Sequence, residues 1–211
     1  MIDQLVVGGK GLAMDFLFDI GSVIVGVDFE PALKRISTLE GDVLAERLNE
    51  TMALKDEMES GRMPADEYFQ WIRERLEHTG CKEEFLNAWT DIFSPNEPMW
   101  HSIRELKNAG HRLILFSNIN QPHQGFLHDK YEIFECFDGG VFSHETGYVK
   151  PEEEIYQHAI EKYNLTPEET AYVDDLAENI AGGERAGFRC HRYSMDQHAK
   201  FEQWLASLTK S

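Results

Sequence analysis

The feature that most constrains this chain is a short apolar run that ends on one carboxylate and then turns. Residues 15–18 read Asp-Phe-Leu-Phe and lead to Asp19, after which Gly21 and Ser22 interrupt the run before it resumes at residues 23–25. Short apolar runs rich in Phe, Ile and Val are typical of buried strands. An acid at the end of such a strand lies at the carboxyl edge of a sheet, where open α/β sheets bind ligands. Taken alone, the pattern also fits an aspartate that caps a turn or a helix.

The acidic balance of the chain limits its partners. Its 211 residues include 20 Lys and Arg against 38 Asp and Glu, which gives a formal net charge of −18 at pH 7. Nucleic acids and anionic membranes need a basic face, so we expect neither as a partner. A small anionic substrate is compatible with this charge if the site supplies local positive charge. The length and a hydrophobic content of 42% suit one generous domain, or one domain that carries an insertion.

The spacing of the cysteines and the absence of membrane-spanning or signal-peptide segments favour a cytoplasmic location. The three cysteines are far apart and show neither metal-ligand nor disulfide spacing: Cys81, Cys136 and Cys190. No apolar segment is long enough to span a bilayer, and residues 1–13 lack the apolar core of a signal peptide. Because Met14 directly precedes the first predicted strand, we interpret residues 1–13 as a late-added extension or as the product of a misplaced start. The oligomeric state is left open.

Residues 29–93 show only helical signals. Pro31 suits the first turn of a helix, and residues 63–66 (Met-Pro-Ala-Asp) are typical of a helix start. Apolar residues recur at helical spacing in three groups: Leu44, Leu48 and Met52; Tyr68, Trp71, Ile72 and Leu76; Phe85, Leu86, Trp89 and Phe93. Such stripes form the core of a helical unit far more often than they contact a cofactor. We therefore predict an all-helical insert.

The rest of the chain alternates between predicted strands and helices. Strands are expected at residues 112–118, 140–143, 170–175 and 188–192. Helices are expected at residues 98–109, 151–163, 178–186 and in a terminal segment ending near residue 208, with residues 121–136 irregular or in short helices. This alternation predicts an α/β fold, a doubly wound parallel-sheet, Rossmann-like core with a small all-helical insert after the first strand. The predicted boundaries assign residues 1–28 and 94–211 to the core and residues 29–93 to the insert.

Polar residues follow the predicted strands in a set order. Asp19 follows the first strand, Ser117-Asn118 the second and Asp174-Asp175 the fourth, and Lys150 precedes a helix between the last two. Because a parallel sheet brings the carboxyl ends of its strands to one edge, these groups can meet at one site. Asp19 and Asp174 can hold Mg²⁺, which is usually bound through one or two carboxylates. Ser117 and Lys150 suit phosphate oxygens, and Asp19 can attack phosphorus to give an aspartyl-phosphate.

This order of residues resembles the haloacid dehalogenase superfamily over nearly the whole chain. Asp19 matches the opening of the first superfamily motif, Ser117 the second, Lys150 the third and Asp174-Asp175 the fourth. The insert stands where the superfamily carries its helical type of cap. The surrounding detail (Phe-Asp-Ile-Gly-Ser-Val-Ile-Val, Ser-Asn-Ile-Asn and Gly-Tyr-Val-Lys-Pro) is similar to the branch of sugar-phosphate phosphatases that includes the α-glucose-1-phosphate phosphatases.

The resemblance implies a Mg²⁺-dependent phosphatase that acts on a small phosphomonoester such as a hexose 1-phosphate. The site residues that it implies are Asp19 and Lys150 for catalysis; Asp19, Asp174 and the backbone carbonyl of Gly21 for the metal; and Ser117, Asn118, Asn120 and Lys150 for phosphate or substrate. Asp175 and Asn179 would position the metal or the lysine, although either residue also suits the cap of the following helix. His123 is a further candidate for the pocket.

One position departs from the superfamily pattern. Phosphatases of the superfamily commonly carry a second aspartate two residues after the nucleophile, as general acid and base, and here that position is Gly21. The backbone carbonyl that would contact the metal is kept, but the proton donor is lost. A positioned acid or base is typically worth roughly 10²–10⁴-fold in rate. We therefore expect substrates whose leaving oxygen needs little protonation, and the anomeric oxygen of a hexose 1-phosphate is such an oxygen.

Two other functions compete with this prediction. The first is a haloacid dehalogenase, which would use Asp19 on carbon without a metal. The Asp174-Asp175 pair argues against it, because two acids beside a third repel one another unless a cation is present. The second is a phosphate-binding protein that has lost catalysis together with the acid at position 21. Such a protein would have no need of Asp19 as a nucleophile.

Overall fold

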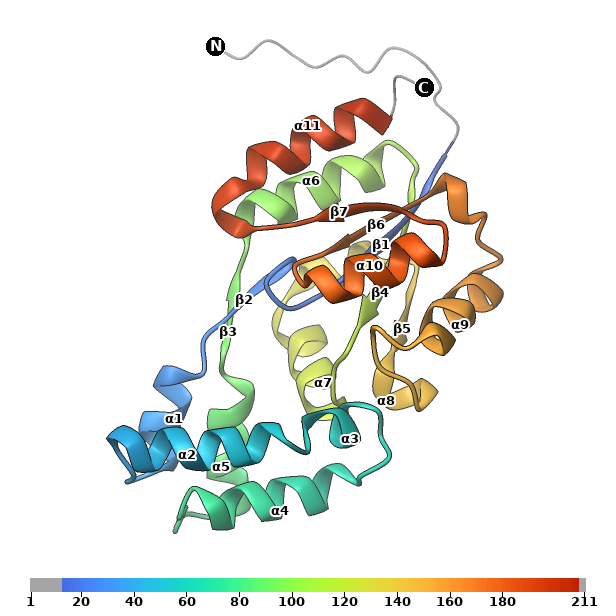
Figure 1. The fold of residues 1–211 in the computed structure, drawn as a ribbon. Coiled ribbons are helices and arrows are strands. Elements are labelled where there is room, and N and C mark those ends of the chain that lie inside the picture. The colour runs from blue at the N-terminus through green and yellow to red at the C-terminus, as the bar shows by residue number, and fades with distance from the viewer. Residues whose placement is uncertain (1–12, 209–211) are drawn as a thin grey trace, which may run out of the picture.

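A five-stranded parallel sheet forms the centre of the structure, a computed structural model that describes residues 13–208 (Figure 1). The strand order is β5 (Gly139–Phe142), β4 (Arg112–Ser117), β1 (Asp15–Phe18), β6 (Thr170–Asp174) and β7 (Arg189–Arg192). All neighbouring pairs are parallel, so the carboxyl ends of the five strands share one edge. The chain extends outward from β1 to β4 and β5 and then resumes beside β1 at β6. The strand order therefore reverses next to β1, which is where sheets of this kind bind ligands.

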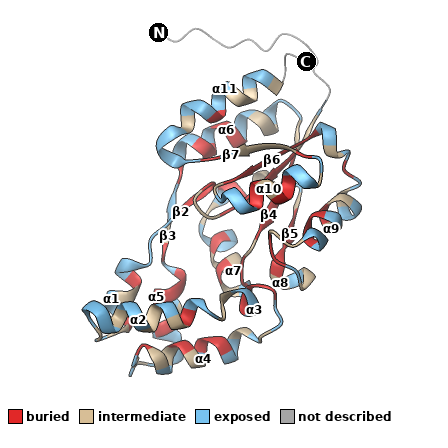
Figure 2. Ribbon diagram, viewed as in Figure 1, coloured by how far each residue is buried: buried red, intermediate tan, exposed pale blue. Residues whose placement is uncertain are grey.

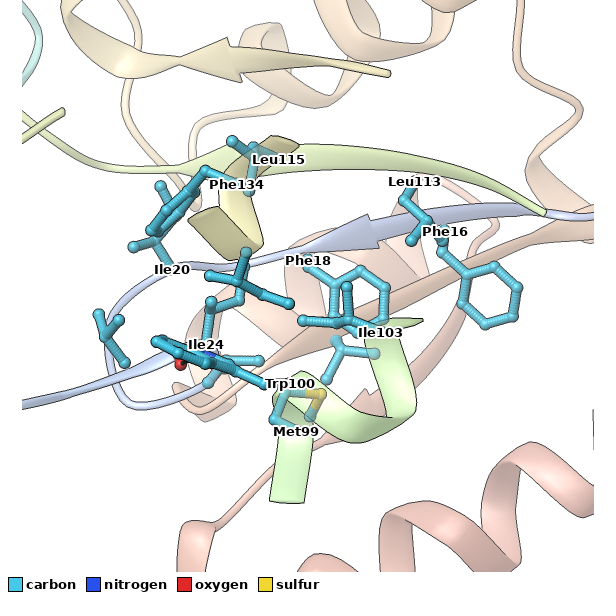
Figure 3. Close-up of a cluster of buried hydrophobic side chains, with 14 of the residues drawn as sticks. Phe16, Phe18, Ile20, Ile24, Met99, Trp100, Ile103, Leu113, Leu115 and Phe134 are labelled. Carbon is cyan, nitrogen blue, oxygen red and sulfur yellow. Dashed lines mark hydrogen bonds between the residues drawn. The ribbon is translucent and has the colours of Figure 1, made fainter. Parts of the chain in front are cut away.

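Successive strand residues pack on opposite faces of the sheet, as the pleat of a β-strand requires. Figure 3 shows one face, on which Phe16, Phe18, Leu113 and Leu115 point toward Met99, Trp100 and Ile103. The intervening residues pack on the other face: Leu17, Ile114, Phe116, Val141 and Tyr172. Both faces are covered, so the inner residues of β1, β4 and β6 are apolar instead of alternating with polar residues.

Helices cover both faces of the sheet. The first face packs against α6 (Glu97–Asn108), α7 (Gln121–Lys130) and α11 (His198–Leu208), and the second against α9 (Glu153–Tyr163) and α10 (Ala177–Arg185). Short connections are η1 (Glu132–Cys136), α8 (Ser143–Thr146), η2 (Pro167–Glu169) and η3 (Met195–Gln197). This two-sided covering of a parallel sheet confirms the predicted doubly wound α/β fold. Residues 121–136, expected to be irregular or in short helices, contain the helix α7 followed by the short helix η1.

Five helices between β2 and β3 form a second hydrophobic cluster. They are α1 (Glu30–Ile36), α2 (Gly41–Met52), α3 (Lys55–Glu59), α4 (Ala65–Arg75) and α5 (Lys82–Thr90), and we call them the helical insert. Their buried residues include Ile36, Met58, Tyr68, Phe69, Ile72, Leu76, Phe85, Ala88 and Trp89. Figure 2 shows that the outer surface of the insert is largely exposed while its inner faces are buried. The predicted aromatic stripes are thus mostly core, but Met52 is exposed.

A two-stranded antiparallel ribbon joins the insert to the sheet. Val25–Val27 (β2) pairs with Phe93–Pro95 (β3), so the chain leaves and returns along adjacent paths (Figure 1). The sequence predicted Phe93 as the last residue of a helical stripe, with a break in the helical pattern over residues 94–98. The helical assignment of Phe93 is wrong, because Phe93 pairs with Val27 across the ribbon. Helical spacing from Phe85 onward hid a three-residue strand too short to show its own period.

None of the helices within residues 13–208 is both long enough and apolar enough to cross a bilayer. The interpretation of residues 1–13 as an extension or a misplaced start concerns a segment of which residues 1–12 lie outside the described part.

Candidate active site

Lys150 and Asp19 meet at the carboxyl edge of the sheet. Asp19 directly follows β1, and its backbone N–H donates to the carbonyl of Val173 in β6 at 2.9 Å. Lys150 Nζ donates to Asp19 Oδ1 at 2.9 Å, to Asp174 Oδ2 at 2.6 Å and to the carbonyl of Phe116 at 2.8 Å. These bonds use all three donors of an ammonium group. They leave Oδ2 of Asp19 without a hydrogen bond among residues 13–208.

Asp174 anchors this lysine from β6. Its side chain is fully buried, and it also accepts hydrogen bonds from the Tyr172 hydroxyl at 2.6 Å, the Leu176 N–H at 2.9 Å and the Asn179 amide at 3.1 Å. Burial opposes the charge on Asp174, but Lys150 lowers the pKa of the carboxyl. Burial likewise opposes the charge on Lys150, but Asp174 and Asp19 raise the pKa of the ammonium. The lysine and this aspartate therefore form an ionised pair.

Three carboxylates make a potential metal site. Asp19, Asp174 and Asp175 each offer one oxygen, and these oxygens lie within 4.8 Å of one another. Burial raises the pKa of Asp19 to about 6, with Lys150 acting against the rise and Asp174 adding to it. Burial and then Asp174 also raise the pKa of Asp175, which the Ser22 side chain partly offsets by a hydrogen bond. Oxygen-only ligands that repel one another suit a hard divalent cation such as Mg²⁺.

The two residues at the end of β4 have different surroundings. Asn118 is tied to the backbone of Lys150: its Oδ1 accepts from the Lys150 N–H at 2.8 Å and its Nδ2 donates to the Lys150 carbonyl at 2.9 Å. The Asn118 side chain therefore positions the Lys150 backbone, and its role in binding substrate stays a prediction. Ser117 is buried, and its hydroxyl makes no hydrogen bond to another described residue. It is thus available for a phosphate oxygen.

Asn120 and His123 were candidates for the pocket, but the structure engages both elsewhere. Asn120 is the N-cap of α7, with Oδ1 accepting from the backbone N–H of His123 at 2.9 Å. Its Nδ2 lies 3.0 Å from His123 Nδ1, and His123 Nε2 lies 3.1 Å from the carbonyl of Trp89 in α5. Burial lowers the pKa of His123 to about 4, so the ring is neutral at pH 7. Asn120 therefore caps α7, and its predicted role in binding substrate stays a prediction.

Gly21 has room for a side chain. Its φ does not lie in the left-handed region, unlike that of the next residue, Ser22, whose φ is 56°. A Cβ at Gly21 would meet only Val27 Cγ2 within 4 Å, at an ordinary contact distance of 3.5 Å. The missing acid at this position is therefore not imposed by the backbone angles or by crowding at the Cβ.

Asn179, in α10, donates to Asp174 and so supports the lysine indirectly.

A buried glutamate that the sequence did not single out also lies at this edge. Glu59 is the last residue of α3, and its backbone carbonyl accepts from the hydroxyl of Ser143 at the end of β5. Its side chain is buried, and its charge interacts with that of Asp19. The surrounding segment, Lys-Asp-Glu-Met-Glu at residues 55–59, is rich in charge. Sequence alone therefore offered no signal that this acid points inward while Glu57 is exposed.

Comparisons with known proteins agree with this fold. A D-ribitol-5-phosphate phosphatase from Bacteroides thetaiotaomicron is 26% identical over 209 residues, 93% of this chain and 98% of the relative. A sesquiterpene phosphatase from Aspergillus oryzae is 26% identical over 176 residues, 81% of this chain and 85% of the relative. A structure of an HAD family enzyme from Bacteroides thetaiotaomicron, in complex with magnesium and inorganic phosphate, superposes with a TM-score of 0.74 at 20% identity, covering 88% and 96% of the two chains.

A family model described as haloacid dehalogenase-like hydrolase matches residues 16–187, which is most of the chain. The match begins in β1, just before Asp19, and ends after α10, so it spans Ser117, Lys150 and the paired aspartates. The chain is therefore a member of the haloacid dehalogenase-like hydrolases.

Proposed function

We propose that this hydrolase is a Mg²⁺-dependent phosphatase of small phosphomonoesters that works through an aspartyl-phosphate on Asp19. The observation that carries the proposal is the hydrogen bond of Lys150 to one oxygen of Asp19, which leaves the other oxygen without a partner among the described residues. A carboxylate held in this way is charged, oriented and available to attack phosphorus. Ser117, which has a free hydroxyl beside this edge, would bind a phosphate oxygen.

The metal assignment follows from how each carboxylate is engaged. Both oxygens of Asp174 already accept hydrogen bonds from the chain. Asp175 is half-buried, and its pKa is raised by burial and by its neighbour, as expected for a carboxylate without a cation. We therefore assign the metal to Asp19 and Asp175, together with the carbonyl of Gly21, and assign Asp174 to the positioning of Lys150. This revises the prediction from sequence, which gave the metal to Asp174. A bound Mg²⁺ would supply positive charge to the phosphate oxygens.

The substrate is proposed to be a sugar or polyol phosphate, with hexose 1-phosphates as the first class to test. The resemblance of the motifs to the α-glucose-1-phosphate phosphatase branch supports this choice, and one relative is named a D-ribitol-5-phosphate phosphatase. The local charges are compatible with a phosphorylated substrate, because the ammonium of Lys150 lies within an otherwise acidic edge.

Three free cysteines support a cytoplasmic location.

One set of assays distinguishes the proposed phosphatase from a haloacid dehalogenase and from a non-catalytic phosphate-binding protein. Mg²⁺-dependent phosphate release should be measured on a panel of sugar phosphates, with 2-haloacids as controls for carbon-halogen cleavage. Asp19→Asn should abolish release. The melting temperature should stay near that of the wild type, because burial already opposes the charge of Asp19, and Asp174 remains as the ionised partner of Lys150. The exposed Asp42 gives the matched control Asp42→Asn, which should be fully active. Release by Asp19→Asn at the wild-type rate would end the proposal, as would halide release without phosphate release.

A further inference from the structure

We propose that Glu59, in the helical insert, is the general acid and base that replaces the missing aspartate at Gly21. The inference rests on the proposed phosphatase function and adds one catalytic residue to it. In the first step, Oδ2 of Asp19 attacks phosphorus, the bond from phosphorus to the leaving oxygen breaks, and the Glu59 carboxyl gives its proton to that oxygen. In the second step, the Glu59 carboxylate takes a proton from the water that attacks the aspartyl-phosphate. Asp19 and inorganic phosphate are released, and Glu59 is again protonated.

Hydrogen bonds fix the end of α3 to the same sheet edge as the nucleophile. The hydroxyl of Ser143, directly after β5, donates to the Glu59 carbonyl and accepts from the backbone N–H of Ile119 at 3.0 Å. Ile119 lies two residues after Ser117, so Glu59 is tied to the loops that follow β4 and β5. Arg62, three residues further, donates to the carbonyl of Gly147 at 3.0 Å. Figure 1 shows α3 beside α8 and α7, at the side of the sheet that faces the insert.

The carboxyl group of Glu59 is buried and incompletely paired. The residue is 7% exposed, and its Oε2 is buried without a hydrogen-bond partner in the described structure. Lys55, on the same helix, forms an ion pair with that oxygen at 3.5 Å but donates no hydrogen bond to it. A buried carboxylate oxygen without a hydrogen bond is costly, so such an atom in a native fold calls for an explanation. A hydrogen bond to a substrate oxygen, formed only when substrate is bound, provides one.

In-line displacement places the leaving group on the side of Glu59. The attacking oxygen comes from Asp19 at the end of β1, and the leaving oxygen departs from the opposite side of phosphorus. The helical insert lies over this edge of the sheet, so a group that leaves away from β1 moves toward α3. Burial raises the pKa of Glu59 to about 7, against the charge of Lys55, with smaller contributions from Asp56 and Asp19 that add to the rise. An acid of that strength can both donate and accept a proton near neutral pH.

The other nearby candidates for this role are unsuitable. His123 is neutral, and both of its ring nitrogens lie against Asn120 and Trp89. Lys150 uses its three donors on the chain, and Asp174 accepts from four groups. Asp175 lies in the carboxylate cluster beside Asp19, on the nucleophile side of the reacting phosphorus.

The decisive experiment compares leaving groups in Glu59→Gln. Release of the alcohol or phenol is measured in single turnover, with enzyme in excess, because the leaving group departs in the first step and phosphate departs only in the second. Wild type and variant are compared on an alkyl phosphate such as a hexose 6-phosphate, whose leaving oxygen is strongly basic, and on p-nitrophenyl phosphate, whose leaving oxygen needs no proton. We expect a loss of roughly 10²–10³-fold on the alkyl phosphate and less than about 10-fold on p-nitrophenyl phosphate. An equal loss on both substrates would overturn the role of Glu59 while leaving the phosphatase function intact.

Two further variants keep this test interpretable. Glu46→Gln changes an exposed acid of α2 in the same insert and should act like the wild type on both substrates. Gly21→Asp, combined with Glu59→Gln, places a carboxyl group where superfamily phosphatases carry one, and the Cβ at that position has room. It should restore at least about tenfold of the lost rate on the alkyl phosphate. A failure of rescue together with a lowered melting temperature in Glu59→Gln would show that the residue is only structural.

The pH profile gives an independent measure. Three charged groups change the pKa of Glu59: Lys55 and Asp56 from α3, and Asp19, which follows β1. The charge of Glu59 in turn raises the pKa of Tyr68 in α4. Because the first step needs protonated Glu59, the single-turnover rate on the alkyl phosphate should fall as the pH rises through the pKa of this carboxyl. The fall should be absent in Glu59→Gln, and it should be absent for p-nitrophenyl phosphate in the wild type. A fall that persists in the variant would assign the proton to another group. A wild type that releases no phosphate from any phosphomonoester would instead refute the phosphatase function itself.

Discussion

Asn118 holds Lys150 by its backbone, through a pair of hydrogen bonds at 2.8 and 2.9 Å that join the end of β4 to the loop before α9. The backbone of the lysine is thus fixed where its side chain reaches Asp19. The amide uses its oxygen and one of its two N–H groups in these bonds, so it acts on the site through Lys150.

Asn118→Ala should displace the backbone of Lys150 and weaken the hydrogen bond from Lys150 Nζ to Asp19. Losing the two hydrogen bonds at a half-buried site should lower the free energy of unfolding by about 1–3 kcal/mol. Because the nucleophile loses its oriented partner, kcat should fall more than KM rises. Steady-state kinetics and urea unfolding measure both effects. The exposed Asn108 supplies the control Asn108→Ala, which should change neither quantity. A purely raised KM would instead mean that the amide does contact substrate.

Mutation should distinguish the roles of the paired aspartates, Asp174 and Asp175. Asp174→Asn leaves a buried ammonium with one carboxylate partner, and breaking such a pair typically costs about 3–5 kcal/mol. Asp175→Asn removes a charge that Asp174 repels, so the melting temperature without metal should stay the same or rise. Its deficit should appear in Mg²⁺ affinity, measured by calorimetry. Strong destabilisation by Asp175→Asn, with metal binding unchanged, would contradict the metal assignment given above.

Gly61 controls how closely the insert approaches the core. Its φ is +73°, and a Cβ there would lie 2.7 Å from the carbonyl oxygen of His144. Gly61→Ala should push the end of α3 off the sheet edge and lower turnover of alkyl phosphates. Gly41 is the matched control, since its φ is +58° with nothing within 4 Å of a Cβ. Both variants incur the left-handed penalty of about 1–2 kcal/mol, but only Gly61→Ala should lose activity. Equal activity of the two variants would show that this contact is unimportant for catalysis.

His123 should make stability depend on pH in a known direction. The folded state holds the pKa at about 4, below the ordinary 6.5, so the unfolded chain binds the proton more readily. Its contribution is therefore present above pH 6.5 and is lost as the pH falls toward 4. The difference in unfolding free energy between wild type and His123→Gln should shrink by about 3 kcal/mol from pH 7.5 to pH 4. Urea unfolding at several pH values measures it, and a constant difference would mean that the ring is solvated.

The fold followed from the sequence wherever burial on both sides forces an apolar strand. The inner residues of β1, β4 and β6 are all apolar, and each strand ends on a polar residue or is followed by one, which marks the sheet edge. The ribbon of β2 and β3 was missed, because Phe93 continues a helical spacing and its strand has only three residues. Strand pairing over such a short length is decided by the partner, which the local sequence does not contain.

The site was predictable to the level of which residues meet, but less so for what each one does. The strand ends bring Asp19, Lys150 and Asp174 together as expected. The roles of Asn118 and Asn120 depend on which backbone groups lie within reach, and that depends on loop geometry. Glu59 was unpredictable for a different reason: its distinction from Glu57 is a matter of which side of a one-turn helix faces the core.

The central position of β1 has a consequence for how the protein is made. The first strand that pairs with β1 is β4, in which Arg112 lies 97 residues after its partner Asp15. The second neighbour, β6, comes later still in the chain. The hydrophobic cluster of the insert is built from residues 33–89 alone, so it can form while the sheet is still incomplete. During synthesis we therefore expect the insert to fold before the long-range strand pairs, whose closure is entropically slow. Asp19, the proposed nucleophile, gains its lysine only after the sheet has closed around β1.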